Sequence, residues 1–163
     1  MTDVRPSAYA ALLALLDSHG AHYRLLDHDP EGRTELVSLL RGHKPSQAAK
    51  CMVVMVKMGK KITRYVLAVV PGNRLVDLVA IKDLLGGTYS AFVSRAVAED
   101  LTGTEAGTIL PFPLSSNLEL IVDPQLLAHD ELFFNAGRLD RSLALRTADY
   151  LAISRPRLER IAR

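Results

Sequence analysis

Apolar residues recur at helical spacing near the start of the chain. Four of them stand at i, i+3, i+4 and i+7, the pattern of one face of an amphipathic helix: Tyr9, Leu12, Leu13 and Leu16. Gly20 then offers a stop. Similar spacing and capping signals predict helices over 75–85 and 94–101, a short helix or turn over 35–41, short helices opening at Asp123-Pro124 and at Thr147, and a basic helix closing the chain.

A second pattern indicates strands. Residues 51–57 form a nearly unbroken apolar run, which a turn at 58–61 joins to a returning strand over 63–70. Residues 102–117 lose all periodicity and predict a long loop. Further strands are expected over 22–28, 89–93, 118–122, 131–135 and 142–145. Short strands, hairpins and irregularly placed helices predict an α+β fold with a mixed, largely antiparallel sheet wrapped by helices.

Composition narrows the setting. The chain has 163 residues, 48% of them hydrophobic, which suits one domain over residues 1–163. Cys51 is the only cysteine, so an intramolecular disulfide is excluded and a reducing, cytoplasmic compartment is expected. No apolar run reaches the roughly 18 residues of a membrane span, so no membrane association is expected.

The basic residues are unevenly placed on a chain whose formal net charge is only +2. They crowd two segments: Arg41, Lys44, Lys50, Lys57, Lys60, Lys61 and Arg64 in the first, and Arg155, Arg157, Arg160 and Arg163 in the second. Two solvated faces and a phosphate-binding surface explain this pattern equally well.

Several familiar sites are poorly supported. The histidines have no CxxC or HExxH around them, and no metal or cofactor is expected. Cys51 lies inside an apolar strand, where a free cysteine usually acts as a small hydrophobe. No GxSxG elbow marks a serine nucleophile.

Two features remain as candidates. Lys50 opens the apolar strand, where it either reaches solvent or holds a positive charge at the edge of a cleft. Strand alternation would then place Cys51 in the core, on the opposite face. The loop from Gly103 to Phe112 could turn free backbone N–H groups toward an oxyanion or a carbonyl oxygen, or be an ordinary surface loop.

The order of these motifs resembles the YbaK/ProX family, which includes the insertion domain of bacterial prolyl-tRNA synthetases. The resemblance runs from about residue 9 to 151 and rests on four motifs: His28-Asp29-Pro30, Lys50 before its strand, the Gly107-x-x-x-Pro111 loop, and Phe134-Asn135-Ala136-Gly137-Arg138. It implies a cytoplasmic enzyme that hydrolyses wrongly charged aminoacyl-tRNA, often tRNA(Pro). It also implies catalytic roles for Lys50, Gly107 and Thr108, and substrate binding by His28, Pro111, Asn135 and Gly137.

Departures from the family bear on specificity. Cysteine-specific members carry a tyrosine where Leu26 stands, an aspartate at Ser142 and a serine at Asn135, and Pro113 replaces a usual glycine. The resemblance therefore favours a small amino acid such as alanine, or one slightly larger, over cysteine. The implied partners are the tRNA acceptor end and, as a further candidate, prolyl-tRNA synthetase.

The implied reaction needs an oriented water and a stabilised negative charge. The amides of Gly107 and Thr108 would hold the acyl carbonyl oxygen, and Lys50 the terminal phosphate or the reacting group. No side chain is an evident general base, so the ribose hydroxyl of the substrate is expected to assist. Two alternatives stay open: a non-catalytic tRNA-binding or regulatory module, and a hydrolase of small esters.

Overall fold

The structure, a computed structural model, describes residues 7–114 and 117–163. Its helices follow the sequence pattern closely, and Ser7, Asp77 and Ser94 cap three of them by accepting a backbone N–H. They are α1 (Ala8–Ser18), α2 (Thr34–Arg41), α3 (Leu78–Leu85), α4 (Arg95–Thr102) and α5 (Thr147–Ser154), with 3₁₀ turns η1 (Pro45–Gln47) and η2 (Pro124–Ala128).

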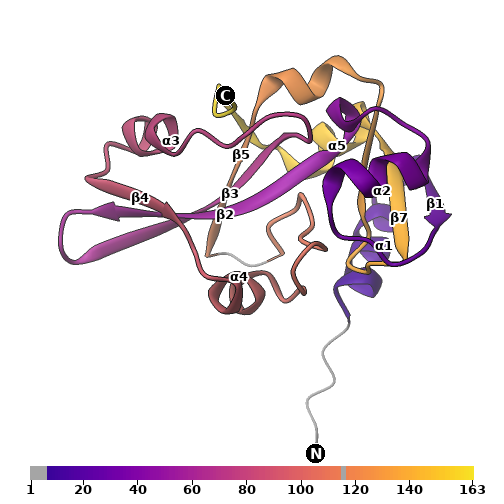
Figure 1. Ribbon diagram of the computed structural model, residues 1–163, viewed down its shortest axis with the longest axis horizontal. Helices are drawn as coiled ribbons and strands as arrows, with labels where there is room; N and C mark the ends of the chain where they lie inside the picture. The colour runs from indigo at the N-terminus through magenta and orange to yellow at the C-terminus, as the bar shows by residue number, and fades with distance from the viewer. Residues whose placement is uncertain (1–6, 115–116) are drawn as a thin grey trace, which may run out of the picture.

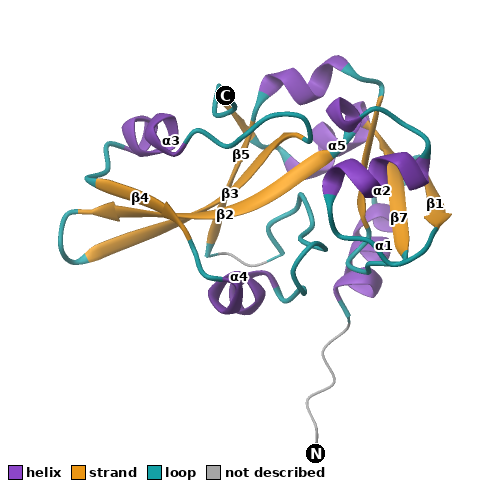
Figure 2. Cartoon of the chain, in the orientation of Figure 1, coloured by secondary structure: helices purple, strands orange, loops and turns teal. Residues whose placement is uncertain are grey.

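The strands form two sheets (Figures 1 and 2). In the larger sheet, β2 (Ala49–Met58) and β3 (Ile62–Pro71) form a long antiparallel hairpin. β4 (Tyr89–Phe92) joins β2 antiparallel, whereas β5 (Leu118–Val122) runs parallel to β3 and β8 (Arg157–Leu158) parallel to β5. The smaller sheet is antiparallel, in the order β1 (Tyr23–Asp27), β7 (Arg141–Arg146), β6 (Glu131–Asn135). The fold is α+β with mostly antiparallel pairing, as predicted.

Strand alternation divides the core into two clusters, one on each face of the large sheet. Val54 and Val56 of β2 pack with Ile81 and Leu85 of α3. On the other face, Val53 packs in a cluster that includes residues of α1, the small sheet and α5. Figure 1 shows α3 and α4 on opposite sides of the hairpin. The alternation accounts for the unbroken apolar run, because β2 buries side chains on both faces.

The two sheets meet where β2 begins. A parallel bridge joins Ala48, one residue before β2, to Phe133 of β6. The backbone of Gly72, after β3, donates to Ala48 O at 3.0 Å, and a Cβ at Gly72 would lie 2.5 Å from Thr34 Cγ2. A side chain therefore cannot be accommodated at this junction, which brings α2, the hairpin and β6 together.

Two expected helices differ at their first turn. The helix expected over 75–85 begins at Leu78, because the backbone of Leu75 pairs with that of Arg163 instead. Thr147 is the first residue of α5 rather than its cap, and its hydroxyl donates to His129 O. The long loop over 102–117 is seen in its described part, while positions 115 and 116, like residues 1–6, lie outside the described residues.

The predicted C-terminal basic helix is wrong. Pro156 disfavours helical backbone at the residue before it, and Arg155 is left-handed with φ 45°. The chain then extends as β8 alongside β5. Beyond it, the buried carboxylate of Asp123 accepts the N–H groups of Ile161 (3.0 Å) and Ala162 (2.8 Å). Arg157 therefore stands on a short edge strand, and the other arginines of this segment lie in the non-helical chain on either side of it.

Candidate active site

A cavity of about 400 Å³ lies at the junction of the two sheets. Such a volume is at the small end of ligand sites in proteins. Its walls come from the start of β2, the end of β6, α2, the β4–α4 segment and the Gly107 loop. Most of the lining is apolar, and the polar or charged side chains on it are Thr34, Arg41, Lys50, Arg95, Glu99 and Asn135, with the thiol of Cys51.

Lys50 and Gly107 both border this cavity, as expected. The ammonium of Lys50 donates to Arg74 O, on the turn that follows β3. Partial burial lowers the pKa of Lys50 below its ordinary value, and the nearby carboxylate of Glu35 opposes this shift without cancelling it. The cation therefore rests on a neutral carbonyl oxygen rather than in an ion pair, so it can transfer to an anionic ligand without breaking a salt bridge.

Cys51 alternates with Lys50 and packs against the core cluster, but it also borders the cavity. The expected separation of site and core is therefore incomplete. The reason is that β2 starts at the cavity, so six consecutive residues, 48–53, line it. Burial raises the pKa of the Cys51 thiol, which keeps it protonated and a poor nucleophile.

The Gly107 loop is held in a conformation that only glycine adopts readily. Gly107 has φ +85°, and a Cβ there would lie 2.9 Å from Gly32 Cα. No partner is found for the Gly107 N–H within residues 7–114 and 117–163. Thr108 is different: it is fully buried, and both its N–H and its hydroxyl donate to Glu105 O, at 3.1 and 2.8 Å. Its amide is therefore already used.

The loop exit is anchored in the core rather than exposed to a ligand. Pro111 O accepts the hydroxyl of the buried Tyr150 at 2.7 Å. Phe112 packs edge-to-face on Phe134 and on Tyr150. Pro111, expected to bind substrate, is not among the cavity-lining residues and instead fixes the far end of the loop.

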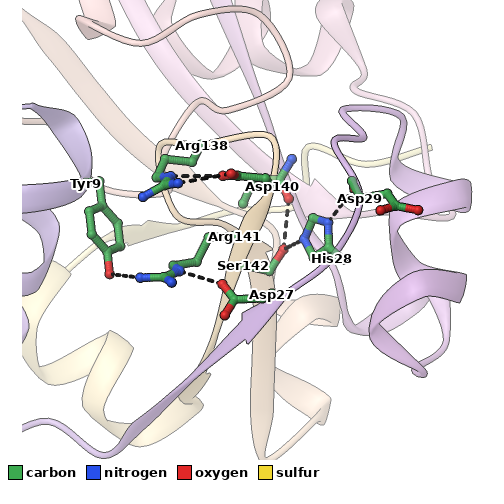
Figure 3. A network of polar contacts seen from close by, with 9 residues as sticks. Tyr9, Asp27, His28, Asp29, Arg138, Asp140, Arg141 and Ser142 are labelled. Carbon is green, nitrogen blue, oxygen red and sulfur yellow. Dashed lines mark hydrogen bonds and ion pairs between the residues drawn. The ribbon is translucent and has the colours of Figure 1, made fainter.

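His28 and Gly137 also lie away from the cavity wall. His28 contacts Ser142 Oγ through Nε2 at 2.6 Å and Asp29 O through Nδ1 at 2.9 Å (Figure 3). Gly137 has φ +75°, and a Cβ there would lie 3.0 Å from the backbone of Tyr9. In this structure, His28 contacts β7 through Ser142, and Gly137 lets the β6–β7 turn approach α1.

Asn135 borders the cavity and joins a buried polar network that includes Arg41, which sequence reasoning did not single out. Arg41 donates through Nη2 to Asn135 Oδ1 at 2.9 Å and through Nε to Ser142 Oγ at 2.7 Å. Burial lowers the pKa of Arg41 to about 10, so it remains charged at neutral pH. In the sequence it was one of many basic residues, and only its position on the inner face of α2 separates it from them.

Glu99 of α4 carries the one carboxylate among the described residues that line the cavity. Its Oε1 accepts from Arg95 Nε at 3.0 Å and from the Ala106 N–H at 3.2 Å. The hydrogen bond from Arg95 and that from Ala106 lower the pKa of Glu99, which makes it a weak base. Glu99 therefore ties the Gly107 loop to α4 rather than offering a general base.

The described residues offer neither a metal site nor a membrane span. Within residues 7–114 and 117–163, no group of three His, Cys, Asp or Glu side chains is placed to hold a metal ion. In the same part of the chain, no helix has the length and apolar character that crossing a bilayer would take.

Comparison with known proteins places this geometry in context. Residues 30–153 match the family described as the aminoacyl-tRNA editing domain. The chain is 40% identical over 148 residues to the multifunctional Ser/Thr-tRNA deacylase ProXp-y of Escherichia coli K12, covering 90% of this chain and 88% of that protein.

More distant similarities agree. The chain is 32% identical over 114 residues to the proline–tRNA ligase of Bacillus licheniformis, covering 69% of this chain and 19% of the ligase. A crystal structure of a candidate trans-editing enzyme for prolyl-tRNA synthetase superposes with a TM-score of 0.79 at 19% identity, over 98% of this chain and 99% of that one. At that identity the similarity shows a shared fold.

Proposed function

This chain belongs to the family of aminoacyl-tRNA editing domains and is a tRNA-editing hydrolase, and we propose that it removes small hydroxyl-bearing amino acids, serine and threonine, from mischarged tRNA, with tRNA(Pro) as the first candidate. The observation that carries the proposal is the placement of Lys50 and the open Gly107 amide on one small cavity. The amino acids are chosen because the 40%-identical relative is a Ser/Thr-tRNA deacylase.

The cavity suits a small acyl group. Its floor is apolar, formed by Ala49, Cys51 and Val53 of β2. Thr34, which also lines the cavity, carries a hydroxyl that makes no hydrogen bond within the described residues. A serine or threonine side chain could place its carbon atoms on the floor and its hydroxyl against Thr34 Oγ1. This arrangement extends the expectation of a residue slightly larger than alanine.

The hydrolysis would proceed by attack of water on the ester carbonyl carbon, with loss of the ribose oxygen as the leaving group. That oxygen takes up the proton that the water gives up and leaves as a hydroxyl. Charge develops on the carbonyl oxygen, and the Gly107 N–H is the donor placed to receive it. The Thr108 amide has no part in this, because Glu105 O already accepts it. Lys50 would leave Arg74 O to hold the terminal phosphate or the developing charge.

Activation of the water is assigned to the substrate. Glu99 has a lowered pKa, and the buried thiol of Cys51 has a raised one, so neither is suited to take a proton at neutral pH. The free hydroxyl of the terminal ribose lies next to the scissile ester in any aminoacyl-tRNA. It can orient the water without a protein base, and the ester is reactive enough for positioning and electrostatics to suffice.

The acceptor stem of the tRNA would lie along basic side chains. Prolyl-tRNA synthetase, which would supply the mischarged tRNA, is a candidate protein partner. Lys60 and Lys61 are exposed at the tip of the β2–β3 hairpin, so they are free to contact phosphates. Such contacts give affinity with little sequence information. The choice of tRNA would then depend on other contacts with the acceptor stem.

A panel of mischarged tRNAs tests the proposal. Serine, threonine, alanine and cysteine are each attached to tRNA(Pro), and serine and threonine also to their own tRNAs, and hydrolysis is followed with purified protein. The expected result is fastest release of serine or threonine from tRNA(Pro). Release of alanine alone would overturn the choice of amino acid, and no release from any tRNA would overturn the assigned substrate class.

A further inference from the structure

The amide of Asn135 is completely used by the protein. Its Oδ1 accepts from Arg41 Nη2 and from Ser142 Oγ, both at 2.9 Å. Its Nδ2 donates to Glu31 O at 2.9 Å and to Gly107 O at 3.0 Å. A side-chain amide offers two donors and two acceptor sites, so none is left for a substrate. Although Asn135 borders the cavity, it must act through the groups that it holds.

The orientation of this amide is set by its neighbours. Arg41 can only donate, so the oxygen of Asn135 must face it. The carbonyl oxygens of Glu31 and Gly107 can only accept, so the nitrogen must face them. A flipped amide would oppose donor to donor on one side and acceptor to acceptor on the other. The network therefore fixes one arrangement of Asn135.

The two carbonyls belong to two loops that touch each other over the cavity. A Cβ built on Gly32 would lie 3.2 Å from Gly107 Cα, so only glycines permit this approach. Both glycines line the cavity. By binding the carbonyl of Glu31 and that of Gly107, Asn135 joins the two loops and fixes the position of the Gly107 amide.

Arg41 is the charged end of this chain of contacts. No carboxylate within the described residues lies within ion-pair distance of it. Its guanidinium meets three neutral acceptors instead: Asn135 Oδ1, Ser142 Oγ and, at 3.4 Å from Nη1, His43 Nε2. A partly buried cation with neutral partners is costly to keep.

We propose that Arg41 is a positioning residue that fixes the Asn135 amide and thereby holds the Gly107 loop against the Gly32 loop in the geometry needed for hydrolysis. The catalytic consequence rests on the proposed function, whereas the effect on the loop does not. Arg41 donates to Asn135 Oδ1 and cannot accept, so it enforces the polarity that sends Nδ2 to both loops. Removing the donor would leave Ser142 as the one described donor to Oδ1, which weakens the hold on the amide and on the two loop contacts that its nitrogen makes.

The sharpest variant is Asn135→Asp, because it keeps size and position and changes polarity. A carboxylate oxygen replaces Nδ2 and faces two carbonyl oxygens, so both loop contacts become repulsive. At the same time the carboxylate gains an ion pair with Arg41, which favours folding. Arg41→Met removes the donor while keeping a long apolar stem, and Arg41→Lys keeps a charge but cannot reach Asn135 and Ser142 with a planar pair of donors.

Amide hydrogen exchange over residues 103–110, followed by mass spectrometry, reads the loop without any substrate. Exchange should rise about tenfold in Asn135→Asp and in Arg41→Met, the effect expected when single hydrogen bonds hold a segment closed. Arg41→Lys should lie between these and the wild type. The matched control is Arg24→Met, since Arg24 is exposed and paired with Glu131 on the small sheet; its loop exchange should equal the wild type.

Single-turnover hydrolysis of Ser-tRNA(Pro) supplies the second readout. The rate at saturating enzyme should fall roughly 10- to 100-fold in Asn135→Asp, with apparent substrate affinity little changed, because positioning rather than binding is lost. Loop exchange in folded Asn135→Asp within twofold of the wild type would overturn the proposal, and so would increased exchange with an unchanged rate. Loop exchange within twofold of the wild type in folded Arg41→Met would likewise overturn the role of Arg41. If that variant fails to fold, Arg41→Lys takes its place with the same criterion, and a wild type inactive on every tRNA leaves the exchange test intact.

Discussion

At the scale of single residues, the cavity presents one hydroxyl without a described partner, that of Thr34. Thr34→Val keeps the shape and removes the hydrogen-bonding group. If Thr34 Oγ1 meets the substrate hydroxyl, release of serine should slow about 5-fold while release of alanine changes little, because one neutral hydrogen bond is worth roughly 1 kcal/mol. The measurement is kcat/KM on Ser-tRNA(Pro) and on Ala-tRNA(Pro). Equal slowing of both would remove Thr34 from specificity.

The environment of His43 makes the stability of the fold depend on pH. Burial lowers its pKa, a hydrogen bond to Lys44 O opposes this, and the charge of Arg41 lowers it further. The ring stacks on Phe133, with centroids 3.9 Å apart. As the pH falls through the ordinary pKa of histidine, about 6.5, the unfolded chain takes up a proton that the folded chain refuses, so stability decreases.

The melting temperature should therefore fall between pH 7 and pH 5.5, and His43→Gln should flatten this dependence while keeping an acceptor for Arg41. Carboxylates such as Glu31, whose pKa is lowered to about 2 by Arg33, act at lower pH: their contribution is lost only below their ordinary pKa. A His43→Gln variant with the same slope as the wild type would show that another group is responsible.

At the scale of elements, Asp123 joins the end of β5 to the C-terminal segment. Its buried carboxylate accepts the N–H groups of Gln125, Ile161 and Ala162, at 2.9, 3.0 and 2.8 Å. Asp123→Ala leaves three donors without this acceptor and should lower the free energy of unfolding by about 3 kcal/mol. Urea unfolding measures the change. A loss below about 1 kcal/mol would mean that water replaces the carboxylate, and that the backbone pairing with β5 and Leu75 and the packing of Ile161 hold the segment.

The same segment shows what sequence patterns can and cannot predict. The hairpin, the helix caps at Ser94 and Asp123-Pro124, and the α+β class follow from local signals and were confirmed, as was the family resemblance. The C-terminal helix was wrong because long-range contacts decided it: β8 pairs with β5, and Asp123 binds backbone thirty-eight positions later. Periodicity carries no information about such partners.

The sequence predicted some residues of the site and missed others. Lys50 and Gly107 were found from the ordered motifs, and both border the cavity. Arg41 and Gly32 were missed, because their importance depends on a contact with Asn135 or Gly107 that only the fold creates. Pro111, His28 and Gly137 were read as substrate-binding, yet each supports the site from a distance, through Tyr150, Ser142 and α1 respectively. Their direct role in binding stays a prediction.

At the scale of the whole molecule, the hairpin tip extends away from the small sheet and carries exposed Lys60 and Lys61 (Figure 1). Replacing both by alanine should weaken tRNA binding and reduce the salt slope of log Kd by up to about 2. The reason is that each phosphate contact releases about one counterion when it forms, and the variant makes fewer such contacts. The rate at saturation should not change, because neither lysine lines the cavity. Filter binding at several salt concentrations measures this, with Arg24→Ala as the control.

An unaltered salt slope in the double variant would place the acceptor stem elsewhere. Lys57 is a weaker choice for this test than sequence alone indicates. It is half-buried, and its ammonium donates to Thr63 Oγ1 at 3.1 Å. The extended C-terminal segment carries four arginines, Arg155, Arg157, Arg160 and Arg163, and would be the next surface to neutralise.

In the proposed mechanism, ester hydrolysis in the cavity at the sheet junction depends on the Lys50 cation. Single-turnover hydrolysis of Ser-tRNA(Pro) by Lys50→Ala tests it most directly, with circular dichroism as the folding control. Lys50 is only partly buried and has one hydrogen bond to a carbonyl, so the fold should persist. This mechanism requires a loss of roughly 100-fold or more, as for other fixed electrostatic groups, and incomplete recovery in Lys50→Arg. A folded Lys50→Ala protein with near wild-type rate would contradict it.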